Sequence, residues 1–123
     1  MRLLMMASLV LAFSCGSISR SDHILAFIPG DYEHPFDDDL SRGIIVLRIT
    51  PVQGGHYGIE RLSAVIRKRN GIELPVKYDT ACWTAIYDEQ RHALYEQQKG
   101  KILLFFPKES KLMIGSSEYQ KIK

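Results

Sequence analysis

The sequence predicts an all-β protein, an antiparallel meander of about seven or eight short strands that form a small barrel or half-barrel after an N-terminal signal peptide. Short runs of β-branched, aromatic and other apolar residues recur at nearly even spacing, separated by Gly, Pro, Asn and Asp. The densest apolar run outside the leader, residues 102–106, lies between Gly100 and Pro107. It is too short for a helix, and its aromatic content predicts a central strand covered on both faces.

Residues 1–14 predict a signal peptide. Arg2 supplies a positive charge, residues 3–13 form an apolar run, and small residues stand three and one positions before Cys15. Residues 11–17 resemble the relaxed lipoprotein signal of Bacteroidota-type bacteria, in which a Ser-Cys junction is common. They depart from the stricter enterobacterial pattern, which has Leu three residues before the Cys and no Phe in this stretch.

This resemblance implies that Cys15 is acylated and becomes the N-terminus, with residues 15–22 as lipidated Cys and tether. More than one acyl chain would anchor the protein stably in a membrane. The alternative is plain secretion with an ordinary Cys15. The second cysteine, Cys82, is then expected to be a small buried hydrophobe beside Trp83; with an unmodified Cys15, a disulfide between the two would be permitted.

A single β domain is expected over residues 23–123, with ordered structure from about Ile24. Residues 33–39 predict an acidic loop, because Pro35 excludes an inner strand. Residues 43–50 are β-branched and apolar and predict a strand. Residues 56–69 fit a helix or a strand; we favour a strand, which needs a bulge near Glu60-Arg61 because the apolar residues change parity there.

The rest of the chain predicts a run of hairpins. Asn70-Gly71 is a hairpin turn. In the strand around 81–87, Trp83, Ala85 and Tyr87 share one face. Further strands are expected at 92–97, 101–107, 111–114 and 119–122.

Several short motifs resemble those of short uncharacterised Bacteroidota lipoproteins. They are the opening Phe-Ile-x-Gly-x-Tyr at 27–32, Trp-Thr-x-x-Tyr-Asp at 83–88 and the closing Tyr-Gln-Lys-Ile at 119–122. This resemblance supports the envelope location and the β architecture, and it carries over no functional residues. The Gly30-x-Tyr32 opening is also similar to the start of lipocalin-like barrels, which implies a lipocalin-like half-barrel.

Composition limits the classes of function. The chain has 123 residues, room for one domain, and a formal charge of +2, too mild to predict nucleic-acid binding. No stretch reaches the ~20 apolar residues of a spanning helix. The basic cluster at 67–69 is interpreted as a solvated strand end, with contact to anionic lipid headgroups as the alternative.

No motif for catalysis, phosphate binding or a metal is present in the sequence. The acidic residues of 31–39 lack the spacing of an EF-hand, and the four histidines occur singly. We therefore expect no catalytic residues, no metal ligands and no cofactor.

The sequence thus predicts a binding or interaction module of the cell envelope, outer-membrane or periplasm-facing, held by an N-terminal lipid. Its expected partner is an envelope protein or polymer. The alternative is a lipocalin-like carrier of a small apolar ligand, whose ligand or core face would comprise Trp83, Tyr87, Tyr95, Leu104 and Phe106.

Overall fold

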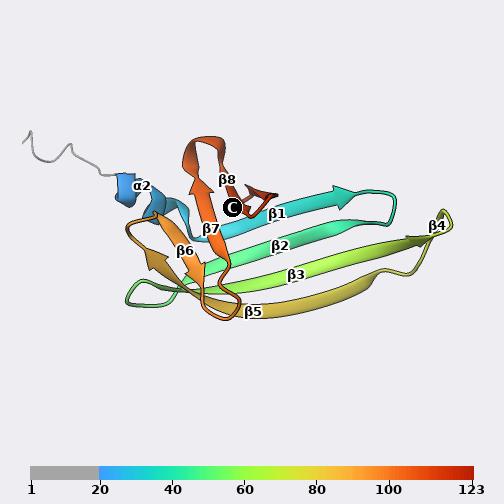
Figure 1. Ribbon diagram of the computed structural model, residues 1–123, viewed down its shortest axis with the longest axis horizontal. Helices are drawn as coiled ribbons and strands as arrows, with labels where there is room; N and C mark the ends of the chain where they lie inside the picture. The colour runs from blue at the N-terminus through green and yellow to red at the C-terminus, as the bar shows by residue number, and fades with distance from the viewer. Residues whose placement is uncertain (1–19) are drawn as a thin grey trace, which may run out of the picture.

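Over the described residues, the protein is a closed antiparallel β-barrel of eight strands, with one additional short strand and one short α-helix. The computed structural model describes residues 20–123, with side chains from Asp22 onward. The signal peptide, Cys15 and residues 15–19 of the tether lie outside the described residues. Figure 1 shows long strands running the length of the molecule and short strands gathered at one end.

The strands follow one another around the barrel in chain order. Each pairs with the next, and the last pairs with the first; only β4 lies outside the ring. The elements are α2 (Arg20–Phe27), β1 (Gly30–Asp37), β2 (Ser41–Pro51), β3 (His56–Arg69), β4 (Ile72–Glu73), β5 (Lys77–Asp88), β6 (Ala93–Glu96), β7 (Ile102–Phe106), the 3-10 helix η1 (Pro107–Glu109), β8 (Lys111–Ile114) and β9 (Ser117–Lys121).

The predicted meander is confirmed, with corrections at four places. Strand β3 is a single strand without a bulge, since its residues pair in unbroken register with β2 and β5. Strand β7 is covered on one face only, because buried Leu103 and Phe105 alternate with exposed Leu104 and Phe106. Helix α2 begins at Arg20, earlier than the expected start of order at Ile24.

The fourth correction concerns the acidic segment. Residues 33–37 belong to β1 and pair with β2 along their whole length, so they are not a loop. Pro35 fits this strand because β9 pairs with β1 only at Tyr32 and Glu33. The missing N–H of Pro35 therefore costs the sheet no hydrogen bond on the β9 side.

Helix α2 closes the end of the barrel where the short strands lie. Its Ile24 and the following Ile28 are buried in the main core together with Tyr32, whose hydroxyl lies 2.9 Å from the Ile28 carbonyl oxygen. Gly30, at φ +143°, begins β1 where a Cβ would lie 2.1 Å from the carbonyl oxygen of Lys123. Only glycine fits this crossing of the two chain ends.

Lys121 ties the last strand to this helix end. Its Nζ donates a hydrogen bond to the Phe27 carbonyl oxygen and lies 4.3 Å from the centroid of the Phe27 ring. Burial lowers the pKa of Lys121, and burial raises the pKa of Tyr32 well above its usual range. The closure of the barrel therefore combines a cation with an aromatic cluster.

The long strands continue past the closed barrel as an open sheet. Strand β6 pairs with β5 only from Ala85 onward, and β9 reaches no further along β1 than Glu33. We call this open part, residues 34–46 and 61–82, the arm. It extends away from the short strands in Figure 1.

Candidate functional site

The apolar residues predicted as a ligand or core face do not lie on one face. Trp83 and Tyr87 pack against the core from β5, as expected. Tyr95, Leu104 and Phe106 lie outside, with 45%, 42% and 37% of their surfaces exposed. The reason is strand parity: Leu94, Leu103 and Phe105 are buried, so their neighbours point away from the core.

The sequence predicts a role for each of the two cysteines. Cys15 lies outside the described residues, so its acylation stays a prediction. Cys82 is exposed on β5, and the expectation of a small buried hydrophobe is wrong. Its parity is opposite to that of Trp83, which faces inward, so Cys82 lies on the outer face of the sheet.

The inner face of β3 changes from apolar to basic where the barrel opens. Tyr57 and Ile59 are buried in the core, 7% and 2% exposed. The next inward positions carry Arg61, Ser63, Val65 and Arg67, whose cross-strand partners on β5 include Asp79 and Lys77. Alternation thus continues without a break while the chemistry of the inner face reverses.

These inward residues line a groove of about 510 Å³ on the inner face of the arm. Its lining residues, which define the groove below, are Arg61, Ser63, Val65, Arg67, Leu74, Pro75, Lys77 and Asp79. The lining contains three cations, Arg61, Arg67 and Lys77, and one carboxylate, that of Asp79. Within residues 22–123 none of these three cations forms an ion pair, whereas Arg42, Arg48, Lys68 and Lys111 each do.

Aromatic side chains lie where the barrel gives way to the arm. The His34 and Tyr119 rings are 5.1 Å apart, and His34 Nδ1 lies 2.7 Å from the Glu118 carbonyl oxygen, so Nδ1 is the protonated donor. Burial raises the pKa of Tyr119, and the positive charge of nearby Arg61 opposes that rise. Arg61 therefore acts electrostatically on the inward-facing aromatic residue next to the groove.

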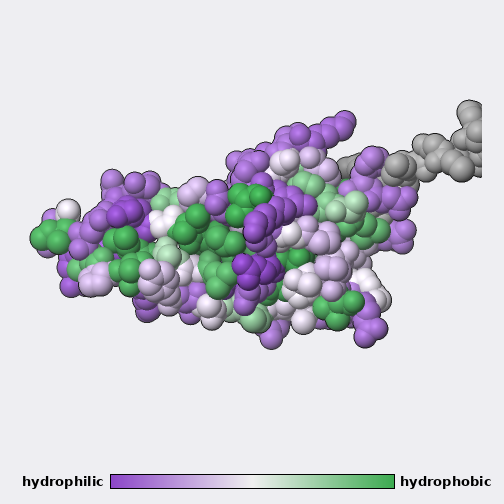
Figure 2. Space-filling model, turned by 180° about the vertical axis from the view of Figure 1, so that it is seen from behind, coloured by the Kyte–Doolittle hydropathy of each residue, from purple (hydrophilic) through white to green (hydrophobic). Residues whose placement is uncertain are grey.

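The outer face of the arm is apolar. Seven residues there form what we call the outer patch: Ile44, Val46, Leu62, Ala64, Ile66, Val76 and Tyr78. Tyr78 is 75% exposed, and the ion-paired Arg48 and Arg42 flank the patch at its two ends. Figure 2 shows hydrophobic side chains gathered on this face between strongly hydrophilic ones.

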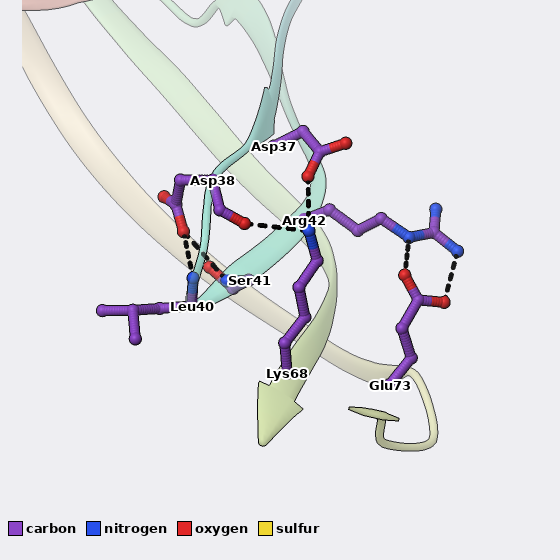
Figure 3. Close-up of polar contacts among 7 residues, drawn as sticks. All are labelled: Asp37, Asp38, Leu40, Ser41, Arg42, Lys68 and Glu73. Atoms are coloured by element: carbon purple, nitrogen blue, oxygen red, sulfur yellow. Dashed lines mark hydrogen bonds and ion pairs between the residues drawn. The ribbon is translucent and has the colours of Figure 1, made fainter. Parts of the chain in front are cut away.

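Ion pairs fix the tip of the arm, as Figure 3 shows. Lys68 Nζ donates to Asp37 Oδ1 at 2.7 Å and to the Asp38 carbonyl oxygen at 2.8 Å. Arg42 forms a two-bond pair with Glu73, with Nε to Oε2 at 2.5 Å and Nη2 to Oε1 at 3.0 Å. These contacts join the β1–β2 hairpin to β3 and β4.

The charges at the tip shift the pKa values of their partners. The hydrogen bond to Asp37 raises the pKa of Lys68, and the hydrogen bond from Arg42 lowers the pKa of Glu73. Backbone N–H groups of Leu40 and Ser41 lower the pKa of Asp38. The acidic segment at 37–38 is thus engaged in holding the tip.

The groove was missed in the sequence because its cations come from two strands. Arg67 was noted only within the basic cluster at 67–69, and the neighbouring Lys68 points the other way, toward Asp37. The parity of Arg61, Ser63, Val65 and Arg67 was the available signal for a polar inner face. Lys77 joins them only through its pairing with Val65.

A second hollow, of about 450 Å³, lies between α2 and η1 and is lined by His23, Ile24, Phe105, Phe106, Pro107, Lys108 and Glu109. Among the described residues, no helix combines the length and apolar character needed to cross a membrane. No protein-family model, curated protein or solved structure matches this chain.

Proposed function

We propose that this chain is a non-catalytic binding module of the cell envelope that holds an acidic segment of a partner protein in the groove of the arm. One observation carries the proposal: three cations that form no ion pair within residues 22–123 line the inner face of the arm, whereas the inner face of the barrel is apolar. Concave sites lined by one sign of charge concentrate the electrostatic potential and attract oppositely charged ligands.

The proposal rests on the contrast between paired and unpaired cations. The cations on the outer face, Arg42 and Arg48, have carboxylate partners within 3.4 Å. The groove offers Arg61, Arg67 and Lys77 only Asp79, and no ion pair with it forms among the described residues. Its lining therefore carries two more positive charges than negative ones, which favours an anionic partner.

The carrier of a small apolar ligand is the second candidate. The eight-stranded barrel and the Gly30-x-Tyr32 opening favour it. A carrier needs a cavity in the barrel, however, and the interior holds fully buried Tyr32, Leu47, Leu103 and Leu112. This filling supports the binding module over the carrier; a stoichiometric apolar compound in a solvent extract of the purified protein would reverse the order.

The anchor is a separate part of the proposal and rests on the leader sequence. Labelled palmitate should enter the native chain and not a Cys15→Ala variant in growing cells, and the native chain should fractionate with membranes. A soluble product without label would overturn the anchor and leave the groove unaffected.

Fluorescence anisotropy with a labelled ten-residue oligoglutamate peptide tests the groove. We expect the native chain to bind this peptide, to bind it more weakly as the NaCl concentration increases, and not to bind oligolysine. The Arg61→Ser, Arg67→Ser, Lys77→Ser triple variant should lose binding. A Lys99→Ser, Lys108→Ser, Lys123→Ser variant makes the same change in net charge outside the groove and should bind normally. Equal binding by both variants would overturn the proposal.

A further inference from the structure

Among the described strands, none pairs with the outer edge of β5 along the arm. Strand β3 pairs with β5 from Lys77 to Ile86, but β6 begins to pair on the opposite side only at Ala85. Within the described part of the chain, no strand lies beside residues 77–83 on that side. This free edge is long enough for a segment of about seven residues, which is longer than a typical short strand.

The direction of the backbone groups along this edge follows from one hydrogen bond. The Gln97 N–H donates to the Thr84 carbonyl oxygen at 3.2 Å, so Thr84 points its backbone groups away from β3. By alternation, Tyr78, Thr80 and Cys82 do the same. Their N–H and C=O groups form the row that an added strand would meet.

The two faces beside this edge differ in chemistry. On the inner side, Lys77 belongs to the groove, with Arg67 and Arg61 on the adjoining strand. On the outer side, the edge is bounded by Tyr78, 75% exposed, and by the rest of the outer patch. A strand added here would place alternate side chains over a basic groove and beside an apolar patch.

We propose that the free edge of β5 binds an extended segment of a partner protein in which acidic residues alternate with apolar residues, adding one strand to the sheet. This inference rests on the proposed function and specifies the form in which the partner binds. Main-chain hydrogen bonds hold the segment, and the two chemically distinct faces select its sequence and register.

Asp79 opposes the pairing of an acidic strand with this edge. Its Oδ1 accepts a hydrogen bond from the Thr80 N–H at 3.0 Å, which occupies one of the outward donors, and its charge opposes an acidic segment. Inward-pointing charges are a known protection of free sheet edges. Replacing Asp79 by Ala should therefore tighten binding of an acidic strand severalfold. Glu89→Ala, which removes an exposed carboxylate elsewhere, should leave the affinity unchanged.

The test uses the full chain with Cys15→Ser and a labelled heptapeptide of alternating Glu and Val. In an antiparallel addition the valine N–H groups face β5, and in a parallel addition the glutamate N–H groups do. We compare the parent peptide with two forms, one N-methylated at the valines and one at the glutamates. One methylated form should bind about tenfold more weakly, and the other should bind like the parent.

Cys82 provides a second readout on the same edge. Its side chain is exposed on the outer face, so bound parent peptide should slow its alkylation by a thiol reagent, and the disruptive methylated form should not. Equal binding of all three peptides, or binding of oligoglutamate alone, would overturn strand addition and leave the groove proposal standing. Failure of every acidic peptide to bind would overturn both.

Discussion

The closed barrel and the arm are made from the same long strands, yet along β3 the chemistry of the two faces is reversed between them. In the barrel the inner face is apolar, with Leu47 and Ile59 buried, and the outer face carries the ion pair of Arg48 with Glu60. In the arm the inner face carries Arg61 and Arg67, and the outer face carries the outer patch. The continuous strand β3 therefore has two opposite amphipathic patterns.

This difference separates folding from binding. Only the barrel is enclosed on all sides by β6–β9 and α2, and its buried side chains hold the fold together. Among the described residues no second layer covers the arm, so the outer patch lies on a surface and the basic residues of the groove face solvent. We expect substitutions in the barrel to change stability, and substitutions in the arm to change binding.

A matched pair on β2 tests that division most strongly. Leu47→Ala should lower the free energy of unfolding by about 3 kcal/mol, because it leaves a cavity beside fully buried neighbours. Ile44→Ala, three residues away in the arm, should cost about 1 kcal/mol or less, because its half-buried site is open to water. Urea unfolding followed by circular dichroism measures both. Equal losses would show that the arm contributes to the core.

Glu96, a buried carboxylate at the end of β6, provides the next largest effect. Its two oxygens accept hydrogen bonds from the Gln98 and Lys99 N–H groups at 2.8 and 2.9 Å. Burial alone would raise its pKa, but these donors and the Lys101 N–H more than offset burial, so the pKa lies below its usual range. Glu96→Gln should cost about 2 kcal/mol near neutral pH.

The pH dependence of this loss follows from the direction of the shift. A carboxyl with a lowered folded-state pKa stabilises the fold above its unfolded-state pKa, and that contribution disappears as the pH falls through the folded-state value. The difference between wild type and Glu96→Gln should therefore shrink below about pH 4.5. Glu89→Gln, at an exposed turn position, should show no difference at any pH.

The helix end of the barrel predicts a smaller effect. Tyr32→Phe removes a buried hydroxyl that lies 2.8 and 2.9 Å from the carbonyl oxygens of Phe27 and Ile28. Thermal unfolding should show a loss of about 1 kcal/mol, since one hydrogen bond is lost while the ring packing stays. The Tyr78→Phe variant, changed on the arm, should unfold at the same temperature as the wild type. A loss of the same size in both variants would contradict the division.

The comparison also explains how far the sequence could predict this structure. Period-2 patterns and turn residues predicted the meander correctly, because they act locally. The change of apolar parity after Glu60 predicted a bulge or a helix, and neither is present. The parity changes at the point where the short strands no longer cover the inner face of the sheet. How far β6 and β9 extend depends on their pairing with residues that are distant in the sequence.

The sequence could not predict the groove, for the same reason. Lys77 meets the β3 cations only through its pairing with Val65, and no local pattern fixes that register. The apolar residues predicted from the sequence as a ligand or core face include Leu104 and Phe106, and the parity of β7 places both outside. Local chemistry predicted the elements, while the site depends on how far each strand extends beyond its neighbour.

The smallest global effect is expected at the tip of the arm. Lys68→Ala removes the contacts to Asp37 and to the Asp38 carbonyl oxygen, which join the β1–β2 hairpin to β3. These groups are solvent-accessible and far from the core, so the urea midpoint should stay within error of the wild type. Amide hydrogen exchange should instead accelerate at residues 37–41 and 68–73, where local opening no longer breaks an ion pair. Lys99→Ala, in the β6–β7 turn, should change neither quantity. A lowered midpoint for Lys68→Ala would mean that the arm and the barrel unfold as one unit, and the separation of binding from folding would then fail.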